Sequence, residues 1–293
     1  MDYCHISPTN HLSITGGRKC HLVLAHLIEK DEKYVEYYLK QKKKYNCTLI
    51  MDNSAFEMYK QNKPMFETNK LLDMARKINA DYIVLSDYPG ENCFETIEAA
   101  NATAPLYKGY GFKTFMVPQG TKGDIDDLIY SFRWAANNPE LIDYIGVSIL
   151  SAPLAFNVES NNKLQRFVSR LKLMYKLKEF LILDKIKDNE QKIHLLGMVD
   201  GPNEIMYMNP FKDYIDSWDS SAAVWLGLHD RTFDSSPTGL IDGKFEKEVD
   251  FDSTLPYNKK VKLNMEYIDT LCETYLEWKW KRKLIMLTMN LKF

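Results

Sequence analysis

The sequence contains no run of about 20 apolar residues, the length a helix needs to cross the hydrocarbon core of a membrane. Its N-terminus also lacks a charged segment followed by an apolar run, the pattern of a secretory signal peptide. The five cysteines are scattered, and no two have the spacing of zinc ligands. An odd number of isolated cysteines is typical of free thiols in a reducing compartment. We therefore expect a cytoplasmic protein with no membrane contact, no metal and no other cofactor.

An excess of charge of either sign is also absent. The chain has 38 Lys and Arg against 40 Asp and Glu, a net charge of −2. This excludes a generally basic coat for nucleic acid, but it leaves room for a local basic face. Hydrophobic residues make up 45% of the chain, and 293 residues suffice for one barrel-sized domain with a large core.

No glycine-rich phosphate loop follows the first predicted strand, because Gly16 and Gly17 precede it. Short apolar runs alternate with helical patterns along the chain. Strands are predicted at residues 21–25, 48–51, 82–85, 114–117, 144–148, 192–196 and 214–215. About seven or eight such units imply a parallel sheet and favour an α/β fold, a (β/α)8 TIM-type barrel. An open doubly wound sheet is the alternative. We expect the barrel to span residues 1–230 and a C-terminal loop and helix, residues 231–293, to pack on it.

Polar residues and glycines follow or interrupt several predicted strands. In a barrel, the carboxyl ends of the strands form the active face. The residues at these positions are Asp52, Asp87, Gln119, Gly120, Gly146, Asp216 and Asp219. Carboxylates and an amide suit recognition of a polar heterocycle, and glycine lets the backbone approach a flat base. Two carboxylates can also divide covalent and proton-transfer work between them.

Aromatic and basic residues near these positions suggest further contacts. Phe56 and Tyr88 lie beside candidate carboxylates and are predicted to stack on a base. His229 and Arg231, just past the last predicted strand, are candidates for a phosphate contact. The segment 278–283 interleaves tryptophans with Lys279, Lys281 and Arg282, which suits either a nucleic-acid backbone or an amphipathic tail.

Several segments, in this order, resemble the tRNA-guanine transglycosylase superfamily. The resemblance is closest to short phage-encoded members related to enzymes that insert 7-deazaguanines into DNA. The segments are Asp52-Asn53-Ser54-Ala55-Phe56, Ser86-Asp87-Tyr88-Pro89, Pro118-Gln119-Gly120, Tyr144-Ile145-Gly146-Val147, His194-Leu195-Leu196-Gly197 and Asp219-Ser220-Ser221. Together they cover residues 20 to about 228, and their order and spacing carry the resemblance.

The resemblance implies a base exchange that replaces guanine with a 7-deazaguanine-type base in nucleic acid. A late aspartate attacks the anomeric carbon, and Asp52 carries the proton to the leaving base and from the incoming one. Asp87, Gln119 and Gly146 hold the purine or 7-deazapurine. The tRNA-acting members have a Cys-x-Cys-x-x-Cys…His zinc site after the barrel, where this chain has only Cys272. DNA is therefore favoured over tRNA as the partner, in the host cytoplasm if the protein is phage-encoded.

Two alternatives stay open from the sequence. Spacing from Gly197 favours Asp216 as the nucleophile, whereas the Asp-Ser-Ser-Ala context favours Asp219. The same carboxylates also suit a nucleosidase or N-glycosidase acting on a small nucleotide, and a barrel without activity that binds a base or nucleotide.

Overall fold

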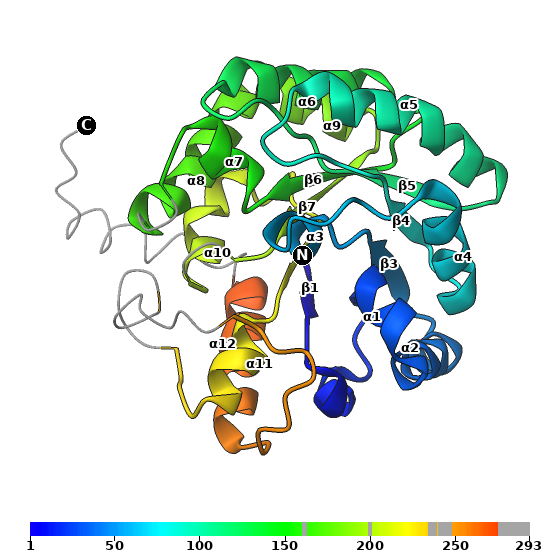
Figure 1. The fold of residues 1–293 in the computed structure, drawn as a ribbon. Helices are drawn as coiled ribbons and strands as arrows, with labels where there is room; N and C mark the ends of the chain where they lie inside the picture. Colours follow the sequence, from blue (N-terminus) through cyan, green and yellow to red (C-terminus); the bar gives the residue numbers. More distant parts are fainter. Residues whose placement is uncertain (160–162, 199–200, 234–238, 240–247, 275–293) are drawn as a thin grey trace, which may run out of the picture.

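Eight parallel strands form a nearly closed barrel surrounded by helices, as predicted (Figure 1). The structure is a computed structural model that describes residues 1–159, 163–198, 201–233, 239 and 248–274. The strands are β1 (Asp2–His5), β2 (Cys20–Leu24), β3 (Thr48–Asp52), β4 (Tyr82–Val84), β5 (Lys113–Met116), β6 (Tyr144–Ser148), β7 (Lys192–Leu196) and β8 (Ser217–Ser220). Hydrogen-bonded ladders run in the order β1-β8-β7-β6-β5-β4-β3-β2, and β1 lies beside β2 to complete the ring.

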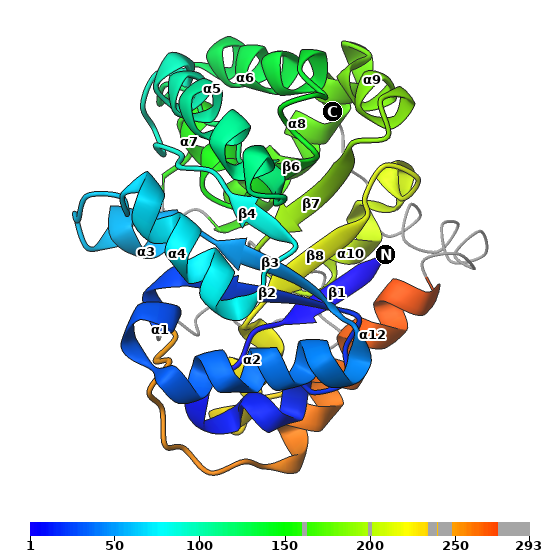
Figure 2. The ribbon, with the colours of Figure 1, turned by 90° about the vertical axis from the view of Figure 1, so that its right-hand side faces the viewer.

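The helices form the outer layer around these strands (Figure 2). They are α1 (Ala25–Lys30), α2 (Glu32–Tyr45), α3 (Ala55–Lys60), α4 (Thr68–Ile78), α5 (Cys93–Gly109), α6 (Ile125–Asn137), α7 (Ser151–Ala155), α8 (Lys163–Glu179), α9 (Ile182–Asp188), α10 (Glu204–Tyr207), α11 (Ala222–Leu228) and α12 (Lys259–Thr274), with 3-10 turns η1 (Thr9–Thr15) and η2 (Asn209–Phe211). None of the described helices is long and apolar enough to span a membrane.

Strand composition explains why most strands match the sequence-based expectation. Every residue of β2 and β6 is buried, because side chains of a barrel strand face either the interior or the helices. The β1 strand was not predicted, and it pairs with β8 so that Cys4 lies opposite Asp219. The strand expected at residues 214–215 is also wrong: β8 begins at Ser217, and Asp219 lies within it.

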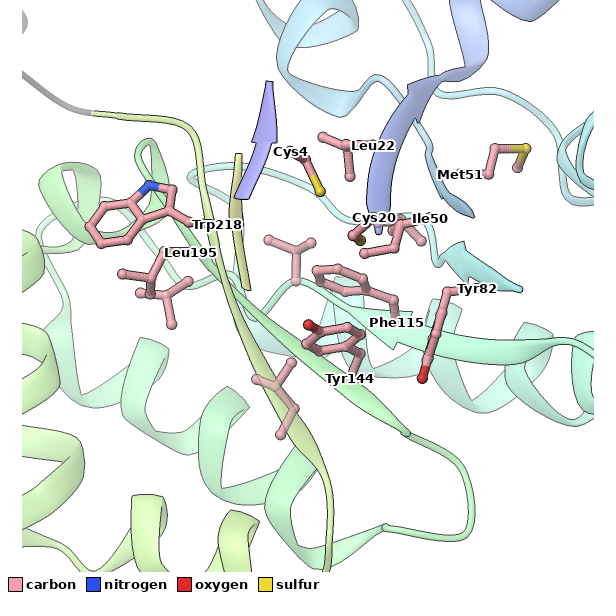
Figure 3. Close-up of a cluster of buried hydrophobic side chains, with 14 of the residues drawn as sticks. Cys4, Cys20, Leu22, Ile50, Met51, Tyr82, Phe115, Tyr144, Leu195 and Trp218 are labelled. Atoms are coloured by element: carbon pink, nitrogen blue, oxygen red, sulfur yellow. The ribbon is translucent and has the colours of Figure 1, made fainter. Parts of the chain in front are cut away.

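Aromatic side chains fill the lower part of the barrel interior (Figure 3). Tyr144 stacks on Phe115 with ring centroids 5.0 Å apart, and its edge meets Tyr82 at 5.2 Å. Cys4, Cys20, Leu22 and Ile50 surround these rings, whereas Trp218 and Leu195 lie away from them. The interior is therefore a packed core rather than a channel, and only the mouth is open.

The C-terminal part of the described chain packs closely against the barrel. Helix α12 lies on α11 and against β1. Asp269 of α12 accepts two hydrogen bonds from Arg18, at 2.6 and 2.7 Å, and lies 3.1 Å from His5. These contacts lower the pKa of Asp269 well below its usual range, against the effect of burial. The ion pair ties α12 to the gap between β1 and β2, where backbone ladders end.

Candidate functional site

A cavity of about 920 Å³ opens at the carboxyl ends of the strands. Four acidic side chains from the strands, from the loop after β4 and from α3 line it: Asp52, Glu57, Asp87 and Asp219. Residues Glu248, Val249 and Phe251, from the segment before α12, form part of the wall. Glu248 reaches across to Lys60 of α3, with 2.8 Å between nitrogen and oxygen. Three of the four sequence-predicted carboxylates, Asp52, Asp87 and Asp219, therefore meet in one cavity, and a C-terminal segment helps to enclose it.

Asp219 faces this cavity from β8 and is almost completely buried. Its Oδ1 accepts hydrogen bonds from the Gly197 backbone N–H at 3.1 Å and from His194 Nε2 at 2.9 Å. Both partners lie on β7 or just beyond it. Among the described residues, Oδ2 of Asp219 has no hydrogen-bond partner, so one oxygen is anchored while the other is available to a ligand.

Behind Asp219, a chain of polar groups runs down the barrel interior. His194 Nδ1 is hydrogen-bonded to Ser217 Oγ, which is in turn bonded to the Tyr144 hydroxyl. Because a carboxylate oxygen only accepts, His194 donates from Nε2, and in the tautomer without a proton on Nδ1 the ring accepts there from Ser217. Tyr144 completes the chain as donor, and burial raises its pKa far above the usual range. We name these three residues, Tyr144, Ser217 and His194, the Asp219 relay.

A buried arginine supports the Gly197 turn that contacts Asp219. Arg170 of α8 donates to both carboxylate oxygens of Glu204 at 2.7 Å and to the Gly197 carbonyl at 2.8 Å. It also donates to the carbonyls of Val147 and Leu196, at the ends of β6 and β7. The fully buried guanidinium of Arg170 thus fixes the backbone at the ends of β6 and β7. This backbone includes Gly197, whose N–H donates to Asp219.

Asp52 ends β3 at the cavity, and the turn after it holds the carboxylate in place. Asp52 Oδ2 accepts from the Ser54 backbone N–H at 2.8 Å. Ser54 has φ +60°, an uncommon left-handed conformation for a non-glycine residue, and its hydroxyl lies 2.9 Å from His26 Nδ1. Burial raises the pKa of Asp52 well above its usual range, and the neighbouring Glu57 raises it further. The raised pKa favours the protonated form of Asp52 more than in an ordinary aspartate.

Asp87 forms a closed pair of hydrogen bonds with two amides. Its carboxylate accepts from Asn53 Nδ2 at 2.7 Å and from Gln119 Nε2 at 2.6 Å. Burial raises the pKa of Asp87 to about 6, although both amide bonds oppose the rise. Because Asp87 fixes the Gln119 amide, Gln119 Oε1 is an acceptor, and it has no hydrogen-bond partner among the described residues. An acceptor of this kind suits a ring N–H or amino group.

Both glycines predicted to contact the base are explained by packing. A Cβ on Gly120 would lie 2.6 Å from the Leu128 backbone N, so this glycine lets α6 approach the loop. A Cβ on Gly146 would lie 2.7 Å from side-chain atoms of Leu196 and Phe115, inside the barrel. Neither glycine lines the cavity, although Leu196 does.

The aromatic and basic residues that were predicted to contact the substrate do not all lie at the cavity. Phe56 lines the cavity, whereas Tyr88 is not among the lining residues. His229 also lies outside the lining and packs against Trp225, which does line it. Arg231 is exposed beyond α11. Lys279, Lys281 and Arg282 lie outside the described residues.

Asp216 lies at the opposite end of the barrel from Asp219. Its Oδ2 accepts from the Ile193 N–H at 2.9 Å, at the start of β7. The same contact recurs before two other strands: Asp81 accepts from Leu49 N–H at 2.7 Å, and Asp143 from Thr114 N–H at 2.8 Å. Each aspartate directly precedes its strand and bonds the preceding strand. Asp216 thus belongs to a set of strand-start contacts.

Two residues of the site escaped the sequence-based prediction. Glu57 lines the cavity, and its Oε2 is buried without a hydrogen-bond partner among the described residues. Burial, with Asp219 nearby, raises the pKa of Glu57 to about 7. His194 lies in one of the segments that carry the resemblance, but no role of its own was predicted for it. The two-residue alternation along β7 places His194 on the same face as Leu196, which lines the cavity, and this signal was in the sequence.

Comparisons with known proteins add little to this description. No protein family model matches the sequence, and no curated protein matches it. Among solved structures, a thiamine phosphate pyrophosphorylase from Pyrococcus furiosus has a TM-score of 0.41 and 10% identity, over 89% of this chain and 86% of that chain. A likeness at this level says nothing about activity, so the barrel is established by its own sheet topology. Among the described residues, no group of three or more His, Cys, Asp or Glu is placed to hold a metal ion.

Proposed function

We propose that this barrel is a base-exchanging glycosyltransferase that replaces guanine in nucleic acid with a 7-deazaguanine-type base. The observation that carries the proposal is the arrangement of Asp219, with one oxygen bound by His194 and Gly197, in the same cavity as Asp52. A buried carboxylate with one anchored oxygen suits a nucleophile. A carboxyl group with a strongly raised pKa suits the proton transfer that must accompany departure of the base.

The reaction requires two displacements at the same carbon. In the first, Asp219 Oδ2 attacks C1′ of the sugar, the C1′–N9 bond breaks, and the proton on Asp52 passes to the departing base. In the second, the incoming base attacks C1′, its N9 proton passes to Asp52, and the bond to Asp219 breaks. Two inversions give net retention, as in carboxylate-nucleophile glycosidases.

Asp87 and Gln119 are the groups that we assign to base recognition. Gln119 Oε1, oriented by the Asp87–Gln119 bond, accepts from a donor on the base. Phe56, at the cavity wall, offers a ring face. A duplex substrate must first turn its base out of the stack. We propose DNA rather than tRNA, because the sequence has no counterpart of the zinc site that accompanies the tRNA-acting members of the family.

The test incubates the protein with a guanine-containing oligodeoxynucleotide or, separately, with tRNA, together with radiolabelled guanine. We expect label in DNA and a covalent protein–DNA adduct after denaturation. Asp219→Asn should abolish both. Asp216→Asn is the matched control: its amide oxygen can still accept from Ile193, and exchange should continue. An Asp219→Asn variant that exchanges at the rate of the unmodified protein would refute the proposal.

The charge of the cavity favours one second candidate, a nucleosidase. Five carboxylates line the cavity, whereas its cationic side chains are Lys60 and Arg166. Such a wall suits a neutral nucleoside better than a phosphorylated one. This candidate predicts release of free guanine from guanosine, slower release from guanosine monophosphate, and no label in polymer. Binding of guanine without any turnover would instead favour a barrel that only recognises the base.

A further inference from the structure

Glu57 is the one acidic side chain of the cavity wall that has neither a predicted role nor a fixed partner. Asp87 is bonded by two amides, Asp219 by His194 and Gly197, and Glu248 by Lys60. Glu57 projects from α3, which directly follows the turn after β3. Its Oε2 is buried and has no hydrogen-bond partner among the described residues.

We propose that Glu57 and Asp52 form a carboxyl pair that holds the proton for the leaving base, with Asp52 as the donor and Glu57 as the residue that keeps it protonated. The inference rests on the proposed base exchange and assigns a role that this reaction leaves open. Both side chains line the same cavity, five residues apart, on the two sides of one tight turn. Both residues are partly buried, and because Glu57 Oε2 is buried, solvent screens this oxygen little from Asp52.

Two carboxyl groups that lie close together in one partly buried site do not both ionise easily, so the pair retains one proton to higher pH than an isolated group does. The charged groups around Glu57 act in both directions. Asp219 on β8 disfavours a second negative charge, whereas Lys60, one turn along α3, favours it. Among the charged neighbours that raise the pKa of Asp52, Glu57 has the largest effect, followed by Asp219 and Asp87. Asp52 and Glu57 also raise the pKa of the Tyr34 phenol on α2, in addition to the larger effect of burial.

Proton balance follows from this pairing. When the C1′–N9 bond breaks, its electron pair goes to the base, and the Asp52 proton goes to the same base. Asp52 is then an anion beside Glu57, which makes it a stronger base for the N9 proton of the incoming molecule. The proton returns to Asp52 as the new C1′–N9 bond forms. Glu57 itself forms no bond to substrate, and it acts through the proton affinity of Asp52.

The experiment compares the pH dependence of kcat for guanine exchange into an oligodeoxynucleotide in the unmodified protein, Glu57→Gln and the surface control Glu67→Gln. Removing a neighbouring anion lowers the proton affinity of Asp52. We expect the alkaline limb of the profile to move to lower pH by about one unit or more in Glu57→Gln, a loss of roughly tenfold above the limb for each unit. Glu67→Gln should match the unmodified protein. Thermal melting measures whether Glu57→Gln is folded.

A second measurement uses a leaving group that needs no proton. An N7-methylated guanine carries its positive charge before the bond breaks, so adduct formation from it should be nearly as fast in Glu57→Gln as in the unmodified protein. An unmoved alkaline limb in folded Glu57→Gln would overturn the pairing. So would equal losses of adduct formation with guanine and with N7-methylguanine. If the unmodified protein forms no adduct and exchanges no base, the proposed function fails instead, and the two failures are distinguishable.

Discussion

The Asp219 relay makes a graded prediction about the nucleophile. His194→Phe keeps an aromatic ring in the barrel interior but removes the donor, 2.9 Å away, that anchors Asp219 Oδ1. A hydrogen bond to a charged group contributes roughly 1.5–3 kcal/mol. If this contribution is lost from the transition state, kcat falls by roughly 10- to 150-fold, at about 1.4 kcal/mol for each factor of ten. The Gly197 N–H still holds the same oxygen at 3.1 Å, which limits the loss.

The two more distant members of the relay should have smaller effects. Ser217→Ala removes the donor to His194 Nδ1 and so leaves the ring free to adopt the wrong tautomer. A neutral hydrogen bond contributes about 0.5–1.5 kcal/mol, and we expect a loss in kcat of roughly 2- to 13-fold. Tyr144→Phe lies one bond further away and should cost less than Ser217→Ala.

Steady-state incorporation of labelled guanine measures both parameters for each variant. We expect the KM for guanine to stay within about twofold of the unmodified protein, because base recognition is assigned to Asp87 and Gln119, outside the relay. The 15N NMR signals of His194 should also show a proton on Nε2 that becomes less populated in Ser217→Ala. An undiminished kcat in His194→Phe would refute the reasoning, as would a larger loss in Tyr144→Phe than in His194→Phe.

Three further predictions concern stability, each measured by urea unfolding. Arg170→Met removes the cation of the buried Arg170–Glu204 ion pair, so the free energy of unfolding should fall by about 3–5 kcal/mol; a neutral result would contradict the buried ion pair. Asp143→Ala removes the acceptor of the Thr114 N–H and should cost about 1–3 kcal/mol while base exchange persists, which loss of exchange in the folded variant would contradict. Glu57→Gln should stabilise the protein at pH 8, by up to about 3 kcal/mol, and have little effect at pH 4, because a carboxyl whose pKa is raised to about 7 costs stability only as pH rises above its ordinary value; a pH-independent difference would refute this assignment.

The sequence predicted the barrel well because its strands carry the ordinary signal of buried β-structure. Residues 144–148 and 192–196 were predicted with the same bounds as β6 and β7, since apolar residues dominate both. The β1 strand was missed because Asp2–His5 has only four residues and no aliphatic side chain, so it shows no hydrophobic pattern. Its place in the barrel depends on pairing with β8, more than 200 residues away, which local patterns do not record.

The position of Asp219 shows a different limit of sequence-based prediction. The segment Ser217-Trp218-Asp219-Ser220 reads as a turn because three of its four residues are polar. In the barrel, Ser217 and Asp219 face inward to His194, while Trp218 faces Arg170 on the helix side and donates to the Gly197 carbonyl. The alternation of a strand is present, but the polar relay reverses the usual pattern of apolar interior residues. The polar contacts of the interior therefore hid β8 from a prediction based on hydrophobic pattern.

The charge of the cavity also bears on how a polymer could be its substrate. The carboxylates of the wall oppose phosphate inside the cavity, and the raised pKa values of Glu57, about 7, and Asp87, about 6, reduce this opposition near neutral pH without removing it. A base turned out of a strand brings no charge with it and leaves its phosphates at the rim. The phosphodiesters of a strand are joined to the same sugar that must reach Asp219 in the proposed reaction, as is the phosphate of a free nucleotide, so the carboxylates oppose close approach of phosphate in both. The proposed exchange in nucleic acid therefore requires that the base and its sugar enter while the phosphates on that sugar stay at the rim, whereas an unphosphorylated nucleoside meets no such opposition.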